Sequence, residues 1–259
     1  MTSDVVHHRR EVIITLRLAT RLRASGRVAT GTPGPGCLPP DDSPLPIGNA
    51  ARGIKDLLPE IDQAQLNKRV KLARKFSAAF THYFPHDDVK AYNDFYDQTV
   101  QFMSGDMAEP FDIQREPANL RNQYGNTPFG QGALLARRLV ERGVRYVEVT
   151  SNQNWDSMHG GTNSLPRLTG ELDGTVSALM NDLRDRGLLG TTMIVVTTEF
   201  GRTPKVKGNG GRDHHPNGFS AMLAGGGVKG GIAVGETDEN GRDPFPEYEP
   251  RDLHATIAT

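Results

Sequence analysis

The stretch "PFGQGALLARRLVERGVRYVEVTS" (128–151) decides the fold class, because a helix pattern and a strand pattern meet there across a single glycine. Thr127 is a predicted N-cap, and Pro128 suits the first helical turn. Gly143 ends the apolar helix pattern, and residues 144–151 have the composition of a strand. This stretch therefore predicts one helix followed directly by one strand.

The same order of patterns recurs in "LPRLTGELDGTVSALMNDLRDRGLLGTTMIVVTT" (165–198). One helical face carries Leu168, Leu172, Val176, Leu179 and Leu183. Gly187 ends this helix, and residues 192–198 form a predicted strand rich in β-branched side chains. Repeated helix-strand units predict an α/β fold with a parallel sheet and helices on both faces. Ligands of such sheets bind beyond the carboxyl ends of the strands, so the loops after residues 151 and 198 are the candidate site.

Other parts of the chain are less regular. Apolar periodicity predicts helices over 65–80 and 89–103, with their apolar stripes as packing faces. Residues 31–50 are rich in proline and glycine, which indicates a linker or a disordered segment, and the first fifty residues are expected to lie outside the core. The glycine-rich segment 223–241 matches no phosphate-binding motif, so its glycines are predicted to serve strand approach and turns.

Composition excludes several classes of function. The 259 residues include 30 basic and 31 acidic side chains, so no overall field favours nucleic acid or an anionic membrane as a partner. Cys37 is the only cysteine, so a metal must be held by His, Asp or Glu. No apolar run reaches the roughly 20 residues of a membrane span. Arginines interrupt the apolar run near the N-terminus, so no clear signal peptide is predicted.

The loop "NQNWDSMHGG" (152–161) follows the first predicted strand. Asp156 and His159 are three residues apart, a spacing that lets a carboxylate and an imidazole reach one cation if the segment turns helically. The alternative is that Asp156 caps the following turn and His159 is a surface residue. Trp155 is predicted to be a packing anchor rather than a substrate platform.

The loop "EFGRTPKVKGNGGRDHHP" (199–216) follows the second strand and concentrates charge. Glu199 leaves the sheet where a carboxylate can face the crevice, and Arg202 is suited to bidentate contact with phosphate or sulfate. The alternative is an ion pair between Glu199 and Arg202 that only braces the loop.

The end of the same loop supplies a second imidazole. His214 is a candidate to share a metal with Asp156 and His159, and two imidazoles with one carboxylate leave positions open for water or substrate. Asp213 is either a further ligand or a group that orients an imidazole, whereas His215 is expected to point elsewhere.

These loops carry a resemblance. The strings "AEPFDIQREPANLRNQYG" (108–125), "NWDSMHGG", "MIVVTTEFGRTP" and "GRDHHPNGFSAMLAGGGVKGG" closely resemble the planctomycete-type bacterial family called domain of unknown function 1501. That family is similar to a branch of the alkaline phosphatase and sulfatase superfamily. The resemblance implies an alkaline-phosphatase-like core and hydrolysis of phosphate or sulfate esters at one or two divalent ions, namely zinc, calcium or manganese.

The resemblance assigns Asp156, His159 and His214 to one metal, and it places Glu199 where relatives have an Asp-His pair for a second metal. Phe200 stands where relatives of the superfamily place a histidine of a second metal, and Asp156 and His159 have one more residue between them than is usual in the family.

Neither the catalytic nucleophile nor the early strands that carry it is recognised in this chain. A partial domain is therefore expected over 51–259, incomplete at both ends, with helices at 65–103 and an α/β core at 127–259. Residues 1–50 are expected to be disordered or foreign to that domain.

Two functions follow as expectations. The first is a metal-dependent hydrolase of a small anionic ester or a sulfated or phosphorylated carbohydrate, inactive if the chain is truncated. The second is a non-catalytic metal- or ligand-binding protein that keeps the fold. The resemblance implies an extracytoplasmic location for intact members. The balanced charge and the absence of a long apolar run predict no nucleic-acid partner and no membrane span.

Overall fold

The structure is a computed structural model, and two compact units contain its described residues. The described residues are 12–18, 45, 47–53, 61–86, 89, 92–93, 96, 100, 106–151, 153–156 and 164–258. One unit combines the N-terminal strand with the chain from Asn119 onward, and the other lies within 27–118. The candidate site belongs to the first unit.

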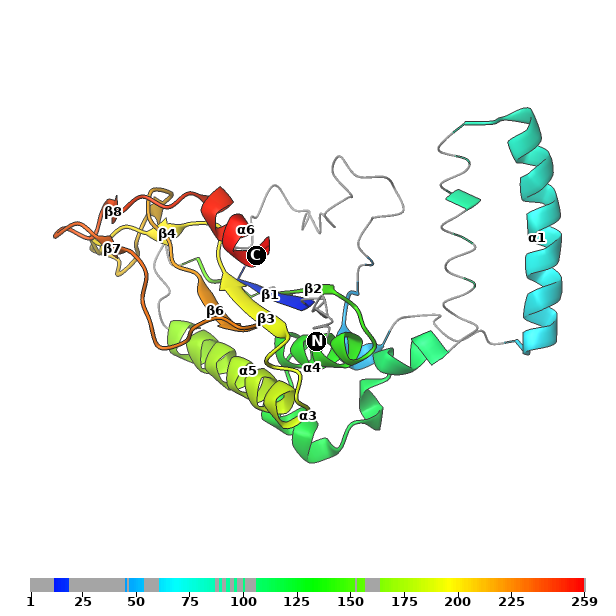
Figure 1. Ribbon diagram of the computed structural model, residues 1–259, viewed down its shortest axis with the longest axis horizontal. Helices are drawn as coiled ribbons and strands as arrows, with labels where there is room; N and C mark the ends of the chain where they lie inside the picture. Colours follow the sequence, from blue (N-terminus) through cyan, green and yellow to red (C-terminus); the bar gives the residue numbers. More distant parts are fainter. Residues whose placement is uncertain are drawn as a thin grey trace, which may run out of the picture. The chain divides into compact units, whose positions relative to one another are not determined.

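A four-stranded sheet forms the centre of the first unit, in the order β2-β1-β3-β6 (Figure 1). The strands are β1 (Val12–Leu18), β2 (Tyr146–Ser151), β3 (Thr192–Thr197) and β6 (Met222–Gly225). β1 pairs in parallel with both β2 and β3, whereas β6 runs antiparallel to β3. The predicted α/β class is confirmed, and the sheet is mixed because β6 returns along its edge.

The central strand comes from the arginine-rich N-terminal segment. Ile14 and Leu16 are both 0 % exposed, so the prediction that the first fifty residues lie outside the core was wrong for residues 12–18. The strand pairs with β2 and β3, which lie far along the chain, and no local pattern reveals such distant partners. Residues 1–11 and 19–44 lie outside the described residues, and the predictions for them stay predictions.

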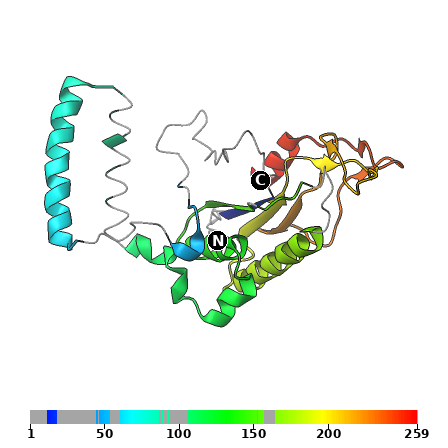
Figure 2. The ribbon, with the colours of Figure 1, turned by 180° about the vertical axis from the view of Figure 1, so that it is seen from behind.

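Helices α4 (Pro128–Glu141) and α5 (Leu165–Asp185) lie side by side against one face of the sheet, as two opposite views show (Figures 1 and 2). Thr127 caps α4 as predicted, since its side chain accepts a hydrogen bond from the Gly130 N–H at 3.1 Å. Gly143 and Gly187 follow the two helices with φ of 85° and 70°, so both predicted stops are confirmed.

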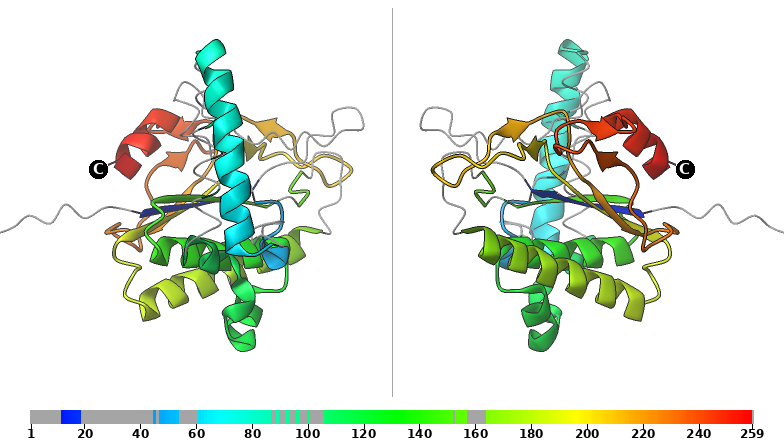
Figure 3. Two further views of the ribbon diagram at one scale, coloured as in Figure 1. Left: turned by 90° about the vertical axis from the view of Figure 1, so that its right-hand side faces the viewer. Right: turned by 90° about the vertical axis from the view of Figure 1, so that its left-hand side faces the viewer.

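The opposite face of the sheet carries less helix in the described part of the chain. Helix α6 (Pro250–Ala258) lies on that side (Figure 3), but it has no buried residues. None of the helices among the described residues is long and apolar enough to cross a membrane.

Two small antiparallel ribbons follow the main sheet. They are formed by β4 (Gly201–Arg202) with β5 (His214–His215), and by β7 (Glu236–Thr237) with β8 (Pro244–Phe245). The turn between β7 and β8 is closed by the Gly241 N–H, which donates to the Asp238 carbonyl at 2.8 Å. Gly225 has a φ of 70°, and a Cβ there would lie 2.3 Å from the Thr192 carbonyl oxygen. The predicted roles of the glycine-rich segment in turns and strand approach are confirmed.

The second unit contains helix α1 (Gln63–Tyr83) and the short helices η2 (Ala50–Arg52), η3 (Asp106–Phe111) and η4 (Ile113–Arg115). The predicted helix over 65–80 is confirmed, with Val70 buried on its inner stripe. Phe76 and Phe80 were predicted on a packing face but are 70 % and 53 % exposed, because they follow a neighbouring stripe. Of the predicted helix 89–103, residues 89, 92, 93, 96 and 100 are described and helical.

An ionic cluster with a buried centre, Arg137 and Asp182, joins α4 to α5. Asp182 Oδ2 lies 2.8 Å from Arg137 Nε, and Asp182 Oδ1 accepts from Arg186 Nε at 2.7 Å. Glu141 bonds both arginines at 2.5 Å. Tyr124, the last residue of α3 (Ala118–Tyr124), donates its hydroxyl to Asp182 Oδ2 at 2.9 Å. These bonds fix the helix layer beneath the sheet, because they link three helices through one carboxylate.

Tyr124 makes stability depend on pH at the alkaline end. Burial, and then the negative charge of Asp182, raises the pKa of the Tyr124 hydroxyl well above its usual range. A group whose pKa is raised by folding stabilises the folded state fully at a pH below its pKa in the unfolded chain, which is about 10 for tyrosine. This stabilisation is lost as the pH rises above that value. The free energy of unfolding should therefore fall above about pH 10, by up to about 1.4 kcal/mol per pH unit from this group.

Chemical denaturation of Tyr124→Phe between pH 9 and 11 measures this contribution. The variant should be less stable at pH 9 and show a shallower alkaline decline than the wild type. Tyr83→Phe is the matched control, because Tyr83 is 76 % exposed and its loss should leave the slope unchanged. Equal slopes for wild type and Tyr124→Phe would contradict the expected coupling.

Candidate functional site

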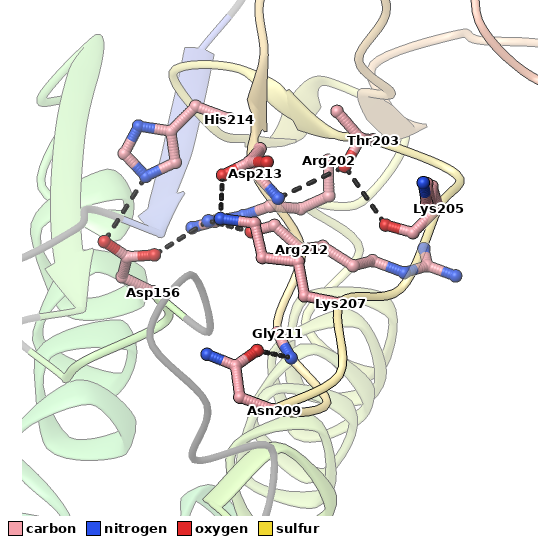
Figure 4. Close-up of polar contacts among 10 residues, drawn as sticks. All are labelled: Asp156, Arg202, Thr203, Lys205, Lys207, Asn209, Gly211, Arg212, Asp213 and His214. Atoms are coloured by element: carbon pink, nitrogen blue, oxygen red, sulfur yellow. Dashed lines mark hydrogen bonds and ion pairs between the residues drawn. The ribbon is translucent and has the colours of Figure 1, made fainter.

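The candidate site lies at the carboxyl ends of β2 and β3. Both strands run parallel to β1, so their carboxyl ends share one edge of the sheet. The chain leaves β2 towards Asp156 and leaves β3 towards Arg202, and Figure 4 shows both side chains converging with His214. Three of the six predicted site residues therefore meet where ligands of α/β sheets bind.

The β4–β5 ribbon brings Arg202 and His214 together. These residues face each other directly in the strand register, so their side chains lie on the same face of the ribbon. The pairing continues into the loop, where the Thr203 N–H donates to the Asp213 carbonyl at 3.0 Å. The Asp213 N–H in turn donates to Thr203 Oγ1 at 3.1 Å. A short ribbon thus places two site residues that are separated by a glycine-rich loop.

Asp156 joins the two basic side chains. Its Oδ1 accepts from Arg202 Nη1 at 2.7 Å, and its Oδ2 lies 3.3 Å from His214 Nε2. The side chains are partly buried, at 22 % exposed for Asp156, 20 % for Arg202 and 35 % for His214. Trp155 Nε1–H donates to the buried Ser151 Oγ at 3.0 Å, which anchors the preceding loop to the end of β2. This hydrogen bond is consistent with the predicted role of Trp155 as an anchor.

Asp156 and His214 carry donor groups of the kinds that bind divalent ions. A carboxylate oxygen and an imidazole nitrogen are common ligands of zinc, with bonds of about 2.0–2.2 Å. Two such ligands in tetrahedral positions are separated by roughly 3.4 Å, and Asp156 Oδ2 and His214 Nε2 are 3.3 Å apart. Asp156 presents its other oxygen to Arg202, an arrangement that orients a metal-binding carboxylate. The donor chemistry and the spacing are both compatible with a divalent ion.

Arg202 keeps donors for a ligand. Its Nη1 donates hydrogen bonds to Asp156 Oδ1 at 2.7 Å and to the Arg212 carbonyl at 3.3 Å. Within the described residues, its Nε and Nη2 form no hydrogen bond. A guanidinium held on one side can contact an oxyanion with the other, because its donors are arranged in a rigid fork. The alternative ion pair with Glu199 is replaced by a pair with Asp156.

Other predicted ligands lie apart from this pair. Asp213 forms an ion pair with Lys207, and Glu199 is exposed just beyond β3. Among the described residues, His, Cys, Asp and Glu form no group of three or more that is placed to hold a metal. His159 lies outside the described residues, so its predicted part in the site stays a prediction.

His215 points away from the site, as predicted. Its Nε2 lies 2.5 Å from the carbonyl oxygen of Arg242 in the β7–β8 turn. The backbone N–H of Arg242, together with that of Asp243, holds the pKa of Asp238 below its usual range, against the opposing effect of desolvation. The adjacent residues His214 and His215 therefore contact different parts of the structure, because consecutive side chains of a strand point to opposite faces.

Phe200 is a site residue whose contacts the sequence did not indicate. Its ring centroid lies 4.2 Å from that of the His214 imidazole, with 33° between the ring planes. The guanidinium carbon of Arg202 lies 5.6 Å from the centre of the same ring. The only hint in the sequence is its position two residues before Arg202, in the short connection that follows β3.

Comparison with known proteins identifies the family and nothing beyond it. No curated protein and no solved structure matches the chain. One family profile matches residues 12–259, a range that includes the central strand β1 and every residue of the candidate site. The chain therefore belongs to the family of proteins of unknown function called DUF1501.

Proposed function

We propose that this protein is a metal-dependent hydrolase of phosphate or sulfate esters, with a core of the alkaline phosphatase and sulfatase type. The observation that carries the proposal is the convergence of Asp156, Arg202 and His214 at the carboxyl edge of the parallel strands. The Asp156 carboxylate and the His214 imidazole can bind a cation, and the Arg202 guanidinium can bind an anionic ester beside it.

Each residue has a defined part in this proposal. Asp156 and His214 hold the cation, and His159 is the proposed third ligand. Glu199 stays a proposed ligand of a second ion, and Asp213 stays a tentative further ligand, although the described residues form no group of three or more metal-binding side chains. A bound zinc, calcium or manganese ion supplies Lewis-acid polarisation of the ester. Arg202 binds the ester oxyanion through Nε and Nη2 while Asp156 holds Nη1, so the guanidinium is oriented before substrate arrives.

The substrate class follows from these charges. Arg202, Lys205, Lys207 and Arg212 give the segment 202–213 four positive charges against the single negative charge of Asp213. This local excess favours an anionic ester, including a sulfated or phosphorylated carbohydrate, although the whole chain is nearly neutral.

A non-catalytic ligand-binding protein with the same fold is the second candidate. The observation that favours it is the Asp156–Arg202 pair at 2.7 Å, which joins the two side chains without a substrate. We assign no catalytic nucleophile, and binding without turnover requires none.

Ester turnover separates the two candidates. The purified chain should hydrolyse p-nitrophenyl phosphate or p-nitrophenyl sulfate after addition of zinc, manganese or calcium, and a chelator should abolish the activity. Asp156→Asn and His214→Ala should each lower kcat/KM by about 100-fold or more, because a metal ligand is lost.

His215→Ala is the matched control, since this neighbouring histidine faces Arg242 and should leave turnover unchanged. Metal binding without turnover of either ester would support the non-catalytic candidate. Turnover that is insensitive to both site variants would contradict the proposed site.

A further inference from the structure

We propose that Phe200 is a positioning residue, whose ring holds the His214 imidazole and the Arg202 guanidinium in the orientations in which both face Asp156. The inference deepens the proposed function and rests on it where metal binding is concerned. Its structural part, the contact between the two rings, stands on geometry alone.

Three side chains of the site contact one another. Arg202 and His214 are direct partners across the β4–β5 ribbon, and Phe200 lies two residues before Arg202, in the short connection between β3 and β4. Phe200 contacts both of these residues. The contacts of 4.2 Å to the imidazole centroid and 5.6 Å to the guanidinium carbon agree with this placement.

The imidazole needs such a support. Rotation about χ2 of a histidine is broad, so its ring is usually oriented by a hydrogen bond from its second nitrogen. Within the described residues His214 has one hydrogen-bond contact, from Nε2 to Asp156 at 3.3 Å, and Nδ1 has none. The face of Phe200 supplies the missing constraint, because it limits the ring planes that His214 can adopt.

The guanidinium benefits in the same way. A cation over an aromatic face is attracted by the negative charge density of that face. Arg202 therefore has Asp156 at Nη1 and Phe200 beneath its guanidinium, two contacts that together fix the plane of its fork. A fixed fork presents Nε and Nη2 in one direction, which an oxyanion ligand requires.

The test compares a ring-less variant with a ring-retaining one. Phe200→Leu removes the ring and keeps an apolar side chain, and Phe200→Tyr keeps the ring. In NMR spectra, the His214 ring protons, assigned with His214→Gln, should be shifted by the Phe200 ring current in the wild type and in Phe200→Tyr. In Phe200→Leu these resonances should move towards ordinary histidine positions. Phe200→Met repeats the ring-less arm if the leucine variant does not fold.

Metal binding supplies the second readout. Cobalt titrated as a zinc substitute should bind about tenfold more weakly to Phe200→Leu, with an altered visible spectrum, and Phe200→Tyr should restore both. Unchanged His214 resonances in Phe200→Leu would overturn the proposal. If the wild type binds no cobalt, the proposed function fails, whereas the NMR comparison still decides the role of Phe200.

Discussion

Asp182→Ala should lower the free energy of unfolding by about 3–5 kcal/mol, the largest effect expected of a single substitution in this chain. Asp182 is the carboxylate shared by Arg137, Arg186 and Tyr124, and the Arg137 side chain is only 1 % exposed. Removal of the carboxylate takes one ion-pair partner from the buried Arg137 while Glu141 stays, and removal of one partner of a buried ion pair costs several kcal/mol. Denaturation in urea at pH 7 measures the loss.

Two further variants define the cause. Asp185→Ala lies on the same helix with an exposed side chain, so it should change stability by less than about 0.5 kcal/mol. The double variant Arg137→Met with Asp182→Leu replaces the charges with apolar groups of similar volume and should recover most of the loss. A cost below about 1 kcal/mol for Asp182→Ala would show that the cluster is solvated rather than buried.

Gly201→Ala should disrupt the β4–β5 ribbon and with it the site. A Cβ at Gly201 would lie 1.8 Å from the Gly218 carbonyl oxygen, a backbone atom that cannot move aside without moving the chain around it. We expect a loss of stability of about 1–3 kcal/mol or more, because overpacking against backbone forces a rearrangement. The larger consequence is functional, since Arg202 and His214 lose the register that aligns them.

Gly208→Ala is the matched control. Gly208 lies in the loop between the two strands, and a Cβ there would have no atom within 4 Å. Thermal denaturation and metal titration of both variants measure the difference, with at least tenfold weaker binding expected for Gly201→Ala alone. Equal behaviour of the two variants would mean that the ribbon does not set the site geometry.

The helix-strand repeats were predictable because their signals are local. The cap at Thr127, the glycines at 143 and 187, and the β-branched run of β3 each carry a physical preference within a few residues. The bounds of α4, α5, β2 and β3 accordingly agree with the sequence to within two residues. The α/β class followed directly from them.

β1 was not predictable by the same means. "VIITLRL" is short, and the arginines around it obscured its pattern, whereas its position depends on parallel pairing with β2 and β3. β1 lies between two strands that are distant in sequence, and this tertiary pairing outweighs the structural preference of its local composition. The antiparallel return of β6 was missed for the same reason.

The candidate site also combines features that local sequence indicated with features that depend on tertiary pairing. The sequence indicated Asp156, Arg202 and His214 from their place after strands, and the structure brings them together. The sequence did not indicate that Arg202 pairs with Asp156, because the two residues lie far apart along the chain. It also did not indicate that Asp213 forms an ion pair with Lys207. The contact of Phe200 with His214 depends on the ribbon register, which the glycine-rich spacer hides.

Isothermal titration of the metal-free chain with zinc, and in parallel with manganese and calcium, tests the central claim most directly. The account predicts one saturable site that loses at least tenfold affinity in Asp156→Asn and in His214→Ala and is unchanged in His215→Ala. Absence of binding by the wild type, or equal binding by all four proteins, would contradict the claim that Asp156 and His214 hold a cation.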